Sequence, residues 1–185
     1  MTVLQLDSAK SHVRIETRAK GLLARLAHDL SIEGAGPKGS CTIDADSFTF
    51  TLEIPVAALR VAGVRKGGRV ETSVLSSGDL ADIHKKLREE VLVGSPSVTV
   101  TATGPAPTDD VKDFVVELTV KAGRGEQRVR TKVARRRDGD RTILAAVATV
   151  SLEALRIPPV KAPLGAFRVD DAIDVHTHLE LVTTG

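Results

Sequence analysis

The chain has 185 residues, 42% of them hydrophobic and 27% charged, with a formal net charge of +2 at pH 7. These values exclude a disordered chain, and a net charge this small does not by itself indicate a polyanionic partner. With four phenylalanines, no tyrosine and no tryptophan, the interior has to be built from aliphatic side chains, and we expect one domain over residues 1–185.

Alternation of apolar and polar residues, typical of a strand with one buried face, recurs along the chain. In chain order it covers residues 12–19, 48–54, 98–103, 114–121 and 173–181, with a further strand expected around Leu30 and Ile32. One apolar face per strand is the habit of antiparallel sheets. The pattern therefore predicts a mainly β fold.

Turn residues separate these runs, notably at 34–37, 104–107 and 123–125. The clearest turn is Asp138-Gly139-Asp140, which joins 127–136 to 141–150 as a hairpin. Short connections between successive strands favour a meander, and a meander can close into an up-and-down barrel without exposed edges.

Two stretches break the alternation and indicate helix. Ser76 and Asp79 have the spacing of a capping box, and an apolar stripe at helical spacing follows them. The stripe consists of Leu80, Ile83, Leu87 and Val91. We therefore expect a helix near 77–92 that covers one end or flank of the sheet. A single helical turn is expected on Leu22, Leu23 and Leu26.

Histidines and one aspartate are the candidates for catalysis or metal binding. His28 and Asp29 could act as base and orienter, but adjacent side chains usually point in different directions, and a turn-capping role is favoured. His176 and His178 are two apart in a predicted strand, so both imidazoles lie on one face and could bind a transition metal. A solvated outer face is the favoured interpretation, because the apolar residues of that strand lie opposite.

A basic hairpin at 124–141 is the other candidate site. Its Arg128, Arg130 and Lys132 share one face and form a cationic stripe. Binders of single-stranded nucleic acid add stacking aromatic residues, which this sequence lacks, so we expect no nucleic-acid partner. Ion pairs between strands are the favoured use of the stripe. An interaction module and a contact to the anionic headgroup of an amphiphile are the alternatives.

No phosphate loop, nucleophile elbow or metal motif of strong spacing occurs, so we expect neither enzymatic activity nor a cofactor. The single Cys41 excludes an intrachain disulfide. The first residues carry none of the regions of a signal peptide, and no run is long enough for a membrane span. We expect a cytoplasmic protein without stable membrane insertion, or a periplasmic one if a signal has been removed.

Four segments resemble a known family when taken in order. They are an opening strand at 11–15, a hairpin at 39–54, a helix followed by a strand at 79–100, and a closing segment at 147–171 that ends in Val169-Asp170-Asp171. Together they resemble the YceI-like family of lipid- or polyisoprenoid-binding barrels. Leu155-Arg156 stands where the family has Phe-Gly, so the chain is similar to a divergent member.

The resemblance implies an extended antiparallel, lipocalin-like β-barrel of about eight strands with one flanking helix. It also implies an elongated apolar interior that holds an isoprenoid, a fatty-acid-like molecule or another amphiphile. The ligand-binding residues would then be Val13, Ile15, Phe50, Leu52, Val98, Val100, Phe114, Val116, Leu118, Val175 and Leu179, with Val129 and Val133 also inward. Small residues at Ala102, Ala145 and Ala148 would leave room for a chain. A packed core is the alternative for the same residues, and a homodimer is left open.

Overall fold

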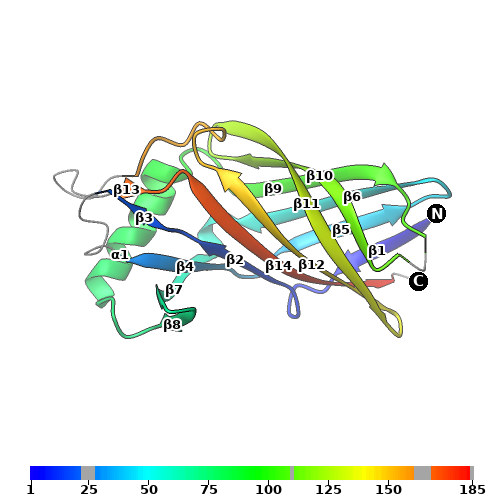
Figure 1. Cartoon of the computed structure of the whole chain (residues 1–185), viewed down its shortest axis with the longest axis horizontal. Coiled ribbons are helices and arrows are strands. Elements are labelled where there is room, and N and C mark those ends of the chain that lie inside the picture. The colour runs from blue at the N-terminus through cyan, green and yellow to red at the C-terminus, as the bar shows by residue number, and fades with distance from the viewer. Residues whose placement is uncertain (22–27, 109–110, 161–167, 184–185) are drawn as a thin grey trace.

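The computed structural model describes residues 1–21, 28–108, 111–160 and 168–183. Its main feature is a closed, eight-stranded antiparallel β-barrel, elongated along one axis, with helix α1 (Ser77–Lys86) at one end (Figure 1). The expected mainly β barrel with one flanking helix is therefore confirmed. The helical turn expected on Leu22–Leu26 and the loop of the closing segment at 161–167 lie outside the described residues.

Three of the eight barrel strands are interrupted, so that each consists of two shorter strands in line. The first joins β1 and β2, which pair with successive parts of β14; the second joins β4 and β5; the third joins β6 and β7. Their bounds are Thr2–Leu6 for β1, His12–Glu16 for β2, Asp29–Gly34 for β4, Lys38–Ile43 for β5, Ser47–Pro55 for β6 and Leu59–Lys66 for β7.

The other five barrel strands are continuous. They are β9 (Ser97–Pro105), β10 (Asp113–Ala122), β11 (Gly125–Asp138), β12 (Arg141–Ser151) and β14 (Ala172–Thr183). Each barrel strand pairs with the next along the chain, and β14 closes the ring on β1 and β2. The predicted meander is confirmed, and so is the hairpin between β11 and β12, whose two-residue turn uses a φ of 62° at Gly139.

Two short elements complete the sheet arrangement. β8 (Arg69–Glu71) forms a hairpin with β7, and β3 (Ala19–Lys20) pairs with β13 (Arg168–Val169) near α1 (Figure 1). We call the end of the barrel with α1, β3 and β13 the helix end. The opposite end, where Thr2 and Thr183 lie, is the terminus end.

The start of α1 follows the predicted capping box. The Ser76 hydroxyl accepts a hydrogen bond from the Asp79 backbone N–H at 3.2 Å, and an Asp79 carboxylate oxygen accepts one from the Ser76 backbone N–H at 2.9 Å. The Ser76 hydroxyl also donates to this carboxylate at 2.7 Å, and that bond first, then the one from the Ser76 backbone N–H, lower the pKa of Asp79. A π-helical turn, η3 (Leu87–Val91), extends α1, which confirms the predicted length. Among the described residues, no helix combines the length and apolarity needed to cross a bilayer.

Among the barrel strands, sequence patterns missed β1 and β7, and they misread one turn. β7 was not predicted because a register irregularity opposite Ser31 and Ile32 breaks its period-two alternation. β1 is too short, at five residues, to show a clear alternation. The turn expected at 34–37 is instead the interruption between β4 and β5, which continue in the same direction.

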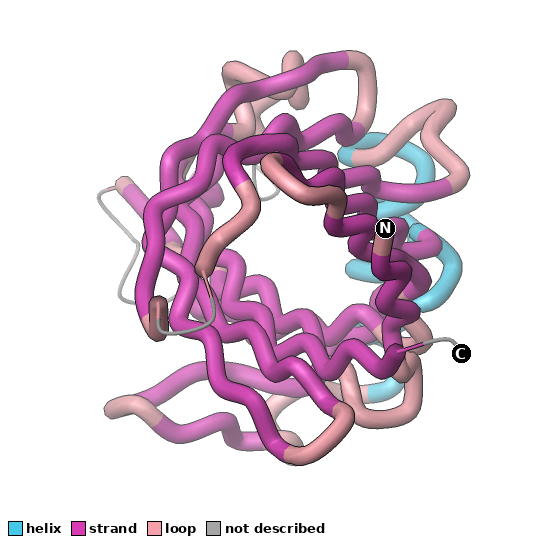
Figure 2. Tube along the Cα trace, turned by 90° about the vertical axis from the view of Figure 1, so that its right-hand side faces the viewer, coloured by secondary structure: helices cyan, strands magenta, loops and turns pink. Residues whose placement is uncertain are grey.

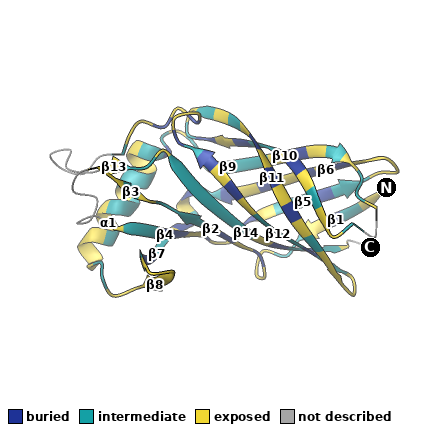
Figure 3. Ribbon diagram, viewed as in Figure 1, coloured by how far each residue is buried: buried dark blue, intermediate teal, exposed yellow. Residues whose placement is uncertain are grey.

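The core lies inside the barrel. Along β6 the residues alternate strictly between exposed and buried up to Ile54, and β11 alternates in a similar way over its middle (Figure 3). The inward residues are almost all aliphatic, so the barrel has an apolar interior and a polar outer surface.

Candidate functional site

The barrel interior contains a continuous cavity with a volume of about 1220 Å³. Its wall extends from Thr2 and Thr183 at the terminus end to Ile83 and Leu87 at the helix end. Figure 2 looks into the terminus end, where the strands run around the interior. The volume exceeds the usual ~300–1000 Å³ of small-molecule sites. The interior is therefore hollow, and the alternative of a fully packed core is wrong.

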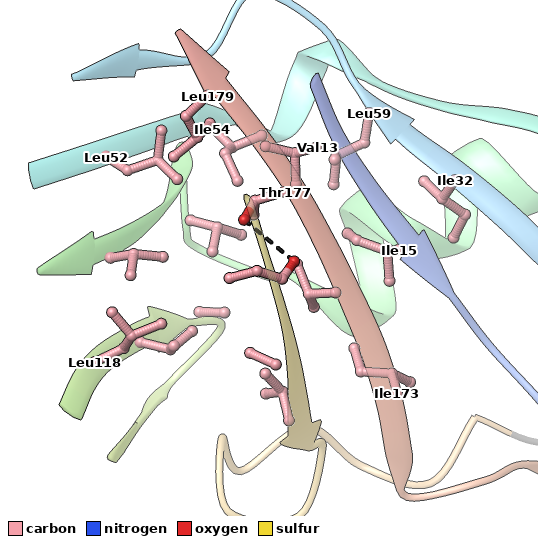
Figure 4. Close-up of a pocket in the computed structure, with 18 of the residues that line it drawn as sticks. Val13, Ile15, Ile32, Leu52, Ile54, Leu59, Leu118, Ile173, Thr177 and Leu179 are labelled. Carbon is pink, nitrogen blue, oxygen red and sulfur yellow. Dashed lines mark hydrogen bonds between the residues drawn. The ribbon is translucent and has the colours of Figure 1, made fainter. Parts of the chain in front are cut away.

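The eleven residues predicted to face inward all line this cavity. They come from β2, β6, β9, β10 and β14, and their register puts them side by side: Leu52 is opposite Val100, and Phe114 is opposite Val133. Figure 4 shows Val13, Ile15 and Leu179 with other wall residues around the open space. Val133 also lines the cavity, whereas Val129 is buried without lining it.

One of the three small residues was assigned to the wrong face. Ala102 and Ala148 line the cavity, but Ala145 does not. Ala145 is opposite His178, on the outer face of β12 and β14, and its neighbour Ala146 takes the inward position. The reason is the period of two, which cannot place residues 145 and 148 on one side of a regular strand.

Other parts of the wall were not predicted as site residues. α1 and η3 contribute Ile83, Leu87 and Val91, so most of the helix's apolar stripe faces the cavity. β4 contributes Leu30 and Ile32. For β4, the alternation of apolar and polar residues indicated which side chains point inward. For the helix, the apolar stripe indicated only that one helix face is buried, not that this face lines a cavity.

The middle of the cavity has few polar groups. Among the described lining residues these are the Thr177 hydroxyl, which donates to the Ala146 carbonyl at 3.4 Å (Figure 4), and the Cys41 thiol. Burial raises the pKa of Cys41, so its thiol stays protonated near neutral pH. The charged lining residues that the structure describes all lie at the two ends. The middle of the cavity can therefore bind an apolar chain but supplies no acid or base.

The histidine and aspartate candidates do not converge. His28 lines the cavity at the helix end, and Asp29 accepts a hydrogen bond from the Ala19 backbone N–H at 2.8 Å, which is the turn-capping role. His176 and His178 are on the outer face.

His176 Nε2 lies 3.3 Å from a Glu16 carboxylate oxygen, without the angle of a hydrogen bond, and His178 Nε2 lies 3.7 Å from Glu180. Within the described ranges, no three His, Cys, Asp or Glu residues gather in a way that could hold a metal ion. The site for a His/Asp-based enzyme is therefore not assembled.

Two of the three residues in the cationic stripe of the basic hairpin are paired with neighbouring carboxylates. Lys132 lies 2.9 Å from Asp113, and Arg128 lies 3.7 Å from Glu117, both across β10 and β11 on the outer surface. These exposed pairs match the favoured interpretation of inter-strand ion pairs, and each contributes little to stability.

Comparisons with known proteins agree with the fold. By sequence, no family model and no curated protein matches the chain. A polyisoprenoid-binding domain from Saccharophagus degradans, implicated in plant cell wall breakdown, is structurally similar, with a TM-score of 0.70, 12% identity and 100% of both chains covered. BcnA from Burkholderia cenocepacia is also similar, with a TM-score of 0.66 and 12% identity over 95% of this chain and 98% of that one. The chain therefore has the fold of these two proteins, and the barrel implied by the YceI-like resemblance is confirmed.

Proposed function

We propose that the protein is a divergent YceI-like barrel that binds and carries one apolar or amphiphilic chain molecule, such as an isoprenoid or a lipid, without altering it. The observation that carries the proposal is the continuous aliphatic cavity of about 1220 Å³, in which the described residues that carry charge line only the two ends. One structural neighbour is described as a polyisoprenoid-binding domain, which supports the same class of ligand.

The energetics favour a long ligand. Each buried methylene contributes about 0.8 kcal/mol, so ten of them contribute about 8 kcal/mol. Association and ordering cost about 4–15 kcal/mol, which a short chain does not clearly exceed. A chain of about twenty carbons contributes about 16 kcal/mol, which exceeds even the upper end of that cost. Because the wall offers shape and apolar contact with few polar groups, chain length and branching should control affinity more than head chemistry does.

Native mass spectrometry of the purified protein, followed by extraction with organic solvent, tests the proposal. We expect one bound chain molecule per protein, or stoichiometric uptake of added geranylgeraniol by protein stripped of ligand. Absence of both a co-purifying chain and any uptake of geranylgeraniol or hexadecanoic acid would overturn the proposal.

Two neighbouring alanines supply a matched pair of variants. Ala146→Phe places a ring inside the cavity beside Thr177, whereas Ala145→Phe places the same ring on the outer face. We expect Ala146→Phe to weaken geranylgeraniol binding by about ten-fold or more and to favour shorter chains, and Ala145→Phe to leave binding within two-fold. Equal effects of the two variants would show that the chain binds elsewhere.

A further inference from the structure

Arg135 differs from Arg141, another charged lining residue at the terminus end, in the groups that it contacts. It lies opposite Leu144 in the register of β11 and β12, and both residues line the cavity. Val133, two residues earlier on the same face, belongs to the aliphatic wall. The Arg135 side chain therefore leaves the inner face of the barrel at the boundary between the apolar interior and the terminus end.

The hydrogen bonds of Arg135 to the described part of the chain are all to backbone carbonyls. Its Nε donates to the Val111 carbonyl at 3.1 Å, Nη1 donates to the Pro107 carbonyl at 3.4 Å, and Nη2 donates to the Thr108 carbonyl. These carbonyls belong to the connection between β9 and β10. The ladder of these two strands covers only Thr99–Ala102 and Leu118–Lys121, so the strands have already parted at this point.

The Arg135 guanidinium has no ion-pair partner among the described carboxylates. Arg141 at the same end provides the contrast, because it lies 3.3 Å from Asp7 and 3.1 Å from Glu180. The carboxylate neighbours raise the pKa of Arg141, Glu180 first. Arg135 instead lies beside an apolar wall, and the described carbonyls use three of its five N–H groups. Within the described residues, the other two N–H groups have no acceptor.

We propose that Arg135 is the headgroup anchor of the cavity and that the ligand is an anionic amphiphile, a long chain ending in a carboxylate or a phosphate. This inference rests on the proposed function and specifies its ligand class. The tail lies in the aliphatic cavity towards the helix end, and the oxyanion accepts the two remaining N–H groups of Arg135. Charge-assisted hydrogen bonds of this kind are about twice as strong as neutral ones, and a nearby apolar wall strengthens them further. A neutral alcohol head can accept a hydrogen bond there but does not balance the charge.

Three ligands with the same tail test the assignment: hexadecanoic acid, hexadecyl phosphate and 1-hexadecanol. Their affinities are measured at pH 8 and low salt by displacement of a radiolabelled hexadecanoic acid tracer from the full-length protein. We expect at least one of the two anions to bind the wild-type protein about ten-fold or more tightly than the alcohol. The anion that binds more tightly distinguishes a carboxylate head from a phosphate head.

The matched variants are Arg135→Gln and Arg136→Gln, which remove the same charge from adjacent residues. Arg136 points to the outer surface, where it lies 3.9 Å from Asp138. We expect Arg135→Gln to reduce the preference for the anion to within two-fold while the affinity for the alcohol stays unchanged. Arg136→Gln should keep the preference. Arg135→Lys, which keeps the charge but not the planar fork, should retain part of it.

The outcomes separate this inference from the proposed function. Equal affinity of wild-type protein for acid, phosphate and alcohol overturns the anionic ligand and leaves chain binding intact. Binding of none of the three contradicts the proposed function itself. An equal loss of preference in Arg135→Gln and Arg136→Gln overturns the role of Arg135 in favour of overall charge. Because the wild-type comparison needs no variant, the inference stays testable even if Arg135→Gln fails to fold.

Discussion

The wall of the barrel is completed in different ways at its two ends. At the terminus end β14 pairs with β1 from Leu181 to Thr183, and β12 pairs with β14 over its whole length, so the wall is a continuous ladder of backbone hydrogen bonds. At the helix end, the pairing of β6 with β9 stops at Pro55. The continuation of β6, which is β7, pairs with β4 on one side and with β8 on the other. There α1 packs against β7 and supplies part of the wall.

The closure by α1 is much weaker than the closure by strands. None of the residues in α1 or η3 is fully buried, whereas Leu181 at the terminus end is completely buried. One hydrogen bond fixes the middle of the helix: the Val61 backbone N–H donates to His84 Nε2 at 3.1 Å. The comparison indicates that strand pairing determines the stability of this barrel, and that the helix contributes mainly local order at one end.

Truncation of one apolar residue at each end measures this difference. Leu181→Ala removes a fully buried side chain beside the closing ladder and should lower the free energy of unfolding by about 2–4 kcal/mol. Ile83→Ala removes a half-buried side chain from α1 and should cost about 1 kcal/mol or less. Urea denaturation followed by circular dichroism measures both. Costs of equal size would contradict the view that the strands dominate stability.

The capping box tests how far α1 depends on its own local structure. Ser76→Ala removes the acceptor of the Asp79 backbone N–H and should destabilise the helix end by about 1 kcal/mol. Ser77→Ala is the matched control, because Ser77 is exposed and is the first residue of the helix rather than its cap. Hydrogen exchange should show faster exchange of the α1 amides in Ser76→Ala alone, with the β12 and β14 amides unchanged. Faster exchange throughout the barrel would mean that the helix is coupled to the strands more tightly than its burial indicates.

The contrast between the ends also explains what could be predicted from the sequence. The strands β6 and β14 have one polar and one aliphatic face, so alternation alone identified the inward residues, such as Leu52 and Leu179. β7 could not be found in this way, because an irregular register interrupts its period. The wall residues of α1 depend on where the helix docks, which is a tertiary property that no local pattern contains.

The candidate anchor shows a signal that was present but merged with its surroundings. Arg135 lies two residues after Val133 and therefore on the same inner face, which the period of two already indicates. Treating residues 124–141 as one basic segment hid this parity, since Arg128, Arg130 and Lys132 have the opposite orientation. Ala145 was placed inside the barrel because the period of two was likewise not applied along its strand. The inward orientation of Arg135 is thus predictable from the period of two along the strand. Its three carbonyl partners are not predictable, because the connection between β9 and β10 has no regular pattern.

The smallest expected effect concerns pH and involves His84 at the helix end. Burial first, and then the charges of Arg60 on β7 and Arg88 on η3, lower the pKa of His84 in the folded protein. The hydrogen bond from Val61 also requires Nε2 to be unprotonated. As the pH falls below about 6.5, the open form of the helix end binds the proton more readily than the closed form does. The closed form is therefore fully stable above that pH and loses stability below it.

Hydrogen exchange of α1 between pH 7.5 and 5.5, corrected for the intrinsic exchange rate, measures this loss. We expect the protection of α1 to decrease towards pH 5.5 in the wild-type protein, and the protection of β12 and β14 to decrease less. His84→Gln keeps an acceptor for the Val61 N–H but does not titrate, so its α1 protection should stay constant over this range. His84→Leu lacks the acceptor and should show low protection at every pH. A pH-dependent loss in His84→Gln as large as in the wild type would assign the effect to another group, and the helix end would then differ from the terminus end in packing alone.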